Sequence, residues 1–173
     1  MNWLAVITKI CPTGAVAIRT GVAAAMPDLA TKFGINTPLR QAHFLAQCAH
    51  ESAGMRTTTE YASGKEYEGR KDLGNTQPGD GVRFKGRGLI QLTGRANYAA
   101  YGKKLGIDLV SHPETAAAFP AAILTAGQYW ADHGLNAFAD KDDVLTITKR
   151  INGGTNGLAE RKAYLAKAKK ALA

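Results

Sequence analysis

The chain has 173 residues, and 22 Lys and Arg against 14 Asp and Glu give it a formal net charge of +8. Its composition is ordinary for a globular protein, which excludes a largely disordered chain, and we expect one domain over residues 1–173. No apolar run approaches the roughly 20 residues that a membrane-spanning helix needs. The excess of positive charge favours an anionic partner, which could be nucleic acid, an anionic envelope polymer or a membrane surface.

The first third of the chain is punctuated by turn-forming residues. Pro12-Thr13-Gly14 ends a first helical segment, and Met26-Pro27-Asp28 is predicted to start another that Gly34 can cap. The two cysteines, Cys11 and Cys48, are too few for a disulfide scaffold. One bridge between them stays open, but the apolar helical pattern around Cys48 favours a buried free thiol. The first ten residues lack a basic segment before their apolar run, so we expect no cleaved signal peptide.

The clearest helix begins at Thr37-Pro38. Thr can cap a helix and Pro tolerates its first position. Apolar residues recur at helical spacing through residues 39–49, and we expect the helix to run to about Ser52 and to stop near Gly54. Its polar candidates for chemistry are His43, His50 and Glu51.

Residues 53–88 are glycine-rich, polar and without a sustained helical period. Irregular segments of this length are usually functional or disordered, and their aromatic anchors favour an ordered binding loop with short strands. Helical patterns return at residues 97–105, 120–133, 142–151 and 158–172. The sequence therefore predicts a mainly α protein with one loop-rich face.

Glu51 closes a mostly apolar helix. Partial burial favours the protonated form of a carboxyl group, which makes Glu51 a candidate general acid. The alternative is an exposed glutamate at a helix end.

Cleavage of a glycosidic bond needs one protonated carboxyl and a second carboxylate on the opposite face of the sugar. Spacing alone does not choose among the acids of the irregular segment, and the alternative is that they form solvated ion pairs with neighbouring Arg and Lys. The acids are Glu60, Glu66, Glu68, Asp72 and Asp80.

The segment from Gly86 to Thr93, GRGLIQLT, is the sharpest local feature. In an extended conformation Gln91 and Thr93 would point to one side, toward a cleft. A structural turn is the alternative. The segment matches neither of the glycine-rich patterns that bind phosphate before a helix.

Other site types find little support. His50-Glu51 is not followed by a second histidine at zinc-binding spacing, and neither cysteine has a C-x-x-C partner, so we expect no metal site and no cofactor. Apart from Lys167, Lys169 and Lys170, the basic residues are spread along the chain, which argues against a nucleic-acid-binding domain.

Three motifs together resemble glycoside hydrolase family 19, which holds plant-type chitinases and phage or prophage endolysins. They are His50-Glu-Ser-Ala-Gly54, the segment Gly86–Thr93 followed by Asn97-Tyr98, and Ile151-Asn-Gly-Gly154. They occur in the family's order and span roughly residues 40–165. The resemblance implies a lysozyme-like, two-lobed, mainly α fold with a loop-rich segment lining the cleft. It also implies inverting hydrolysis of a β-1,4-linked polymer of N-acetylated sugars.

The resemblance also assigns roles to residues. Glu51 matches the general acid and Thr93 the residue that helps to hold the attacking water. For the general base the choice is Glu60, with Glu68 as the alternative or as a substrate-binding residue. The other substrate-binding positions are Gln91, Asn97, Asn152 and Arg161.

The short chain, the lack of a signal peptide and the segment Tyr67–Asn75 are more similar to the endolysin branch. This implies a monomer that hydrolyses bacterial peptidoglycan, waits in the host cytoplasm and acts in the periplasm during lysis, with contacts to the anionic envelope. The alternatives are a chitinase and a catalytically inactive sugar-binding module.

Overall fold

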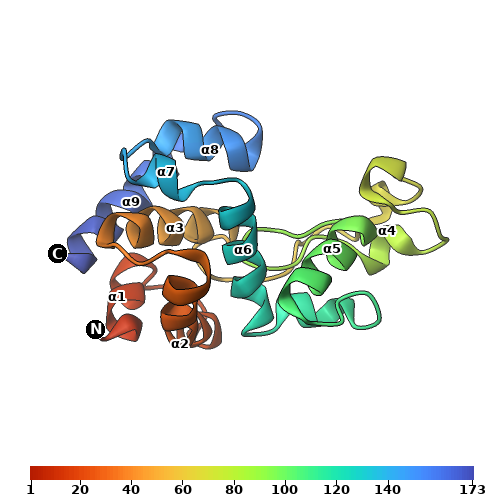
Figure 1. The fold of residues 1–173 in the computed structure, drawn as a ribbon, viewed down its shortest axis with the longest axis horizontal. Helices are drawn as coiled ribbons and strands as arrows, with labels where there is room; N and C mark the ends of the chain where they lie inside the picture. Colours follow the sequence, from red (N-terminus) through yellow and green to blue (C-terminus); the bar gives the residue numbers. More distant parts are fainter.

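The computed structural model describes residues 1–173, and it is mainly α-helical with two lobes (Figure 1). One end of the molecule contains α1, α2, α3, α7, α8 and α9, which we call the larger lobe. The other end contains α4 and α5, the smaller lobe, and α6 lies between them (Figure 1). The α-helices are α1 (Trp3–Ile10), α2 (Val16–Phe33), α3 (Pro38–Glu51), α4 (Asp80–Arg83), α5 (Arg95–Leu105), α6 (Ala121–Asp132), α7 (Asn136–Ala139), α8 (Val144–Asn152) and α9 (Leu158–Leu172). The 3₁₀ helices are η1 (Lys65–Tyr67), η2 (Lys71–Leu73) and η3 (Pro113–Ala117).

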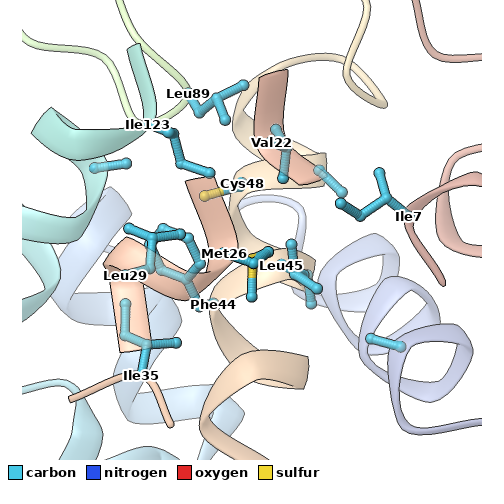
Figure 2. Packing of buried hydrophobic residues seen from close by; sticks show 14 of the residues in the cluster. Ile7, Val22, Met26, Leu29, Ile35, Phe44, Leu45, Cys48, Leu89 and Ile123 are labelled. Carbon is cyan, nitrogen blue, oxygen red and sulfur yellow. The ribbon is translucent and has the colours of Figure 1, made fainter. Parts of the chain in front are cut away.

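Each lobe has its own hydrophobic core. The larger core joins 30 buried residues, and Figure 2 shows side chains of α1, α2, α3 and α6 meeting there with Leu89 of the segment Gly86–Thr93. Phe44 and Trp130 pack edge to face in it, with ring centroids 5.5 Å apart. The smaller core joins Phe84, Leu92, Tyr98, Leu109 and Ala116. Two separate cores explain the two lobes that the family resemblance implied.

Helix α3 runs through the larger core and ends at the candidate acid. The Thr37 hydroxyl accepts a hydrogen bond from the Arg40 amide at 3.3 Å, and Pro38 opens the helix, as predicted. All nine residues from Gln41 to Ala49 are buried, because neighbouring helices surround this part of α3. Cys48 is among them, and both Cys11 and Cys48 are free thiols.

The predicted helix start at Met26-Pro27-Asp28 is wrong. Helix α2 is continuous from Val16 to Phe33 with Pro27 inside it, although proline removes one backbone donor. Val22, Met26 and Leu29 on the same helix are fully buried, so packing against the core holds the helix through the proline. Gly34 does cap this helix, in the left-handed conformation. None of the helices is long and apolar enough to span a membrane.

A buried histidine links α3 to the segment before α8 and predicts the response of the fold to acid. The His43 ring is fully buried, and its Nε2 lies 2.7 Å from Asp142 Oδ1. The other Asp142 oxygen accepts a hydrogen bond from Lys169 Nζ of α9. Burial lowers the pKa of His43 despite the neighbouring Asp142. The Lys169 ammonium is the main reason that the pKa of Asp142 is lowered.

Both pKa shifts make the folded protein less stable as the pH falls, because the unfolded chain then binds more protons than the folded chain. The free energy of unfolding should therefore fall as the pH drops below about 6.5, the ordinary His value, and fall again near the ordinary Asp value. Urea unfolding at pH 7.5 and pH 5 tests this prediction. His43→Gln should reduce the loss between these two pH values, and an unchanged loss in that variant would contradict the assignment to His43.

Candidate active site

The carboxylate of Glu51 is held by a buried arginine from the other end of the chain. Glu51 is the last residue of α3, and its side chain is 22% exposed. Its Oε1 accepts a hydrogen bond from Nη2 of Arg161, which lies in the first turn of α9 and is fully buried. No protein donor contacts the other Glu51 oxygen. The structure thus brings together two of the residues that the family resemblance singled out.

Gln47 fixes the arginine from the opposite side. Its Oε1 accepts a hydrogen bond from Arg161 Nη1, and Arg161 Nε donates to the Asn156 carbonyl. The Gln47 Nε2 is buried and has no partner. Gln47 was not predicted as a site residue, although its position four residues before Glu51 puts both side chains on one helix face.

We expect Gln47→Leu to lower kcat by about 10- to 100-fold, because Arg161 would lose a fixed partner and Glu51 its alignment. An unpaired buried donor should also cost about 1–3 kcal/mol of stability. The matched control is Gln41→Leu, a buried residue of the same helix that donates to the Ile35 carbonyl. That change should lower stability and leave kcat unchanged. Equal kcat values for both variants and wild type would contradict the role given to Gln47.

The neighbouring His50 brings the start of α9 against the end of α3. Its Nδ1 lies 2.5 Å from Glu160 Oε2, and its ring covers Gly157 so closely that a Cβ there would lie 2.1 Å from the ring. Gly157 also has a positive φ of 72°. Only glycine fits this contact, which places Arg161 beside Glu51.

Asn152 lies at the end of α8. The Tyr129 hydroxyl of α6 donates to the Arg150 carbonyl at 2.9 Å and so fixes this end of α8. Burial, together with the charge of Glu51, raises the pKa of Tyr129. Asn152 itself is exposed, and its side chain forms no hydrogen bond with the protein.

Glu60 sits in a different setting. Its Oε2 accepts a hydrogen bond from the Tyr67 hydroxyl at 3.0 Å, and its Oε1 is buried without a partner. A Cβ on Gly86 would lie 2.9 Å from Glu60 Oε2 and 2.7 Å from Gln91 Oε1. Both side chains therefore converge over Gly86, and glycine leaves room for them.

The expectation that residues 86–93 are extended is wrong. Residues 88–91 form a turn. Two hydrogen bonds close it: the Arg87 amide donates to the Leu92 carbonyl, and the Leu92 amide donates to the Arg87 carbonyl. Leu89 and Ile90 are consecutive and both buried in the larger core, so this segment does not alternate. Gln91 is exposed at the end of the turn. Beyond the turn, Asn97 Nδ2 donates to the carbonyl of the partly buried Thr93 at 2.7 Å.

Comparison with known proteins identifies the family. Residues 17–146 match the sequence model of family 19 glycosyl hydrolases, described as chitinase class I. The chain belongs to glycoside hydrolase family 19. This family 19 hydrolase is 36% identical over 179 residues to a glycosyl hydrolase family 19 domain-containing protein of Haemophilus influenzae, an alignment that covers 84% of this chain and 87% of the relative.

Two further matches are to chitinases. An Arabidopsis thaliana endochitinase is 31% identical over 144 residues, which cover 83% of this chain and half of the relative. Chitinase C from Streptomyces griseus shares the fold, with a TM-score of 0.76 at 24% identity over 99% of this chain and 78% of that one. The family 19 hydrolase is a glycoside hydrolase, and its fold is chitinase-like.

Glu68 of this hydrolase has structural contacts. Its two carboxylate oxygens accept hydrogen bonds from the backbone amides of Gly79 and Gly81, at 2.6 and 2.8 Å. Glu68 thereby closes the loop between η1 and α4. Among the other acids, Asp80 is buried and paired with Arg95, which lowers the pKa of Asp80, while Asp72 forms an exposed pair with Arg70. No group of three or more His, Cys, Asp or Glu side chains is placed to hold a metal ion.

Proposed function

We propose that this hydrolase cuts β-1,4 glycosidic bonds in the glycan strands of bacterial peptidoglycan, as an endolysin that acts as a monomer. The observation that carries the proposal is the pair of unlike carboxylates. Glu51 is held by a buried guanidinium, whereas Glu60 is held by a phenol and keeps one buried oxygen without a partner. An acid and a base with separate supports are what glycoside hydrolysis requires.

In the proposed mechanism, Glu51 gives its proton to the glycosidic oxygen as the bond to the anomeric carbon breaks. Its oxygen without a protein donor faces the substrate, and Arg161 stabilises the carboxylate that remains. Glu60 takes a proton from a water molecule, and that water attacks the anomeric carbon from the opposite face. Thr93 helps to orient the water. The reaction is one displacement with inversion.

The remaining site residues bind the sugar. Gln91 and Asn97 contact it from the loop-rich side and Asn152 from the end of α8. The backbone hydrogen bonds of Glu68 support Glu60 over Glu68 as the base, because the Glu68 carboxylate is already used to close its own loop.

Two features support the proposed substrate: the resemblance of Tyr67–Asn75 to the endolysin branch, and the net charge of +8, which suits an anionic bacterial envelope. In this role the enzyme stays in the host cytoplasm until lysis, acts on the wall from the periplasm and contacts the anionic envelope. Chitin is the second candidate substrate, favoured by the sequence similarity to a plant endochitinase.

Loss of turbidity of chloroform-permeabilised Gram-negative cells tests the substrate, with soluble chitin oligomers in parallel and Glu51→Gln as the control. Rapid clearing by wild type alone, with slight chitin turnover, is the expected result. Efficient chitin cleavage without clearing of the cells would show that the protein is a chitinase and not an endolysin. Binding without activity on either substrate would favour an inactive sugar-binding module.

A further inference from the structure

A basic hollow lies at the far end of the larger lobe. Helix α1 packs against the C-terminal half of α9, at the end of the molecule away from α4 and α5 (Figure 1). Between them is a hollow of about 300 Å³, lined by Lys9, Lys167, Lys170 and Ala171. Lys170 is nine residues from Arg161 on the same helix, about 14 Å along its axis. The hollow is therefore separate from the candidate active site.

The three lysines of this hollow have no acidic partners. All three are exposed, and none forms an ion pair, whereas the adjacent Lys169 is paired with Asp142. The segment α1 contains no acid, and the single acid of α9, Glu160, contacts His50. Lys167 Nζ lies 5.4 Å from the centroid of the Tyr164 ring, and this cation–π contact supplies no compensating negative charge. Three uncompensated ammonium groups around one hollow favour an anion.

Apolar side chains protrude from α1 and from the residues just before and after it. Six large hydrophobic residues of the whole chain are exposed, and three of them occur within the first 16 residues. Leu4 lies on α1 and is 43% exposed, Met1 just before α1 is 74% exposed, and Val16 at the start of α2 is 68% exposed. A small soluble anion would need only the lysines. Lys9 and Leu4 both lie on α1, and lysines together with exposed apolar side chains match a lipid surface, which offers phosphate groups and an apolar boundary.

We propose that this α1–α9 face binds bilayers rich in anionic phospholipid, with headgroup phosphates at Lys9, Lys167 and Lys170 and with Leu4 and Met1 at the acyl boundary. This face would make the envelope contact of the proposed function. The inference rests on that function only for its biological setting. Bound in this way, the enzyme keeps Glu51 and Glu60 away from the membrane and available to glycan.

Sedimentation with vesicles tests the proposal. Wild type should bind vesicles of equal parts phosphatidylglycerol and phosphatidylcholine, and should not bind phosphatidylcholine alone. Each lysine near an anionic surface contributes roughly fivefold to the affinity, so the triple change Lys9→Gln, Lys167→Gln and Lys170→Gln should weaken binding at least about tenfold. The matched control changes Lys32, Lys103 and Lys141 to Gln, three exposed lysines outside the hollow and without ion pairs. It removes the same charge and should retain binding within about twofold.

Equal losses in the two triple variants would overturn the proposal, because net charge alone would then explain binding. Binding to neutral vesicles at the same affinity, or complete competition by millimolar inorganic phosphate, would also overturn it. Peptidoglycan hydrolysis without lipid is measured on the same proteins and should be equal in all three. Absent vesicle binding with normal hydrolysis rejects only the membrane site, and vesicle binding without hydrolysis rejects only the proposed function.

Discussion

Glu51→Gln should abolish nearly all turnover while the fold stays intact. Gln has the same shape and can still accept a hydrogen bond from Arg161 Nη2, but it has no carboxyl proton to give. General acid catalysis typically contributes about 10²- to 10⁴-fold, and we expect kcat to fall by that amount. Steady-state kinetics on the glycan substrate and the Tm of the variant check both parts of the prediction.

The matched control is Glu160→Gln, which removes one negative charge from the same region, at the pair with His50. It should keep most of the activity because Glu160 touches no reacting atom. Substantial activity of the Glu51→Gln variant would show that Glu51 is not the general acid. If both variants lost the same amount of activity, the cause would be the lost negative charge of this region and not the missing acid.

Glu60→Gln should also lower kcat by about 10²- to 10⁴-fold, because the attacking water would lose its base. Glu68→Gln should behave differently. It replaces a carboxylate that accepts from two backbone amides by a group with one oxygen and one NH₂, so one amide loses its acceptor. We expect a lower Tm and a raised KM for Glu68→Gln, with kcat within about tenfold of wild type.

The stereochemistry of the product gives a second check on Glu60. An inverting pair of carboxyl groups stands about 6.5–9.5 Å apart, which leaves room for water, whereas about 5 Å would indicate retention. The anomeric proton of the first product, followed by NMR, should show inversion. Retention, or a Glu68→Gln variant that folds normally and is as inactive as Glu60→Gln, would contradict the assignment of the base.

The sequence predicted well those features that depend on local chemistry. Helix α3 was found because Thr37 and Pro38 mark its start by their own side chains, and Gly34 was found as a cap because it can adopt a positive φ. Local rules failed where tertiary packing decides. Pro27 stays inside α2 because the core holds the helix, and Leu89 and Ile90 are both buried because the chain turns there.

In the candidate site, too, some features depend on local sequence and others on tertiary packing. The family resemblance pointed to Glu51 and Arg161, but the sequence did not place them in contact, because these residues are 110 positions apart. Gln47 and Tyr67 were missed because their roles depend on partners that only the folded chain brings near. The proposed choice of Glu60 over Glu68 uses the hydrogen bonds of Glu68 to backbone amides, and sequence spacing does not contain this information.

Mass spectrometry of purified peptidoglycan sacculi, digested by wild type and by Glu51→Gln, tests the central claim most directly. Wild type should release glycan fragments that carry intact stem peptides and one new reducing-end sugar for each bond cut, and the sugar at that end will identify the bond. The variant should release almost none. Sacculi left without new reducing ends, by an enzyme that cleaves chitin oligomers in the same buffer, would contradict the account of this hydrolase as a peptidoglycan-cleaving enzyme.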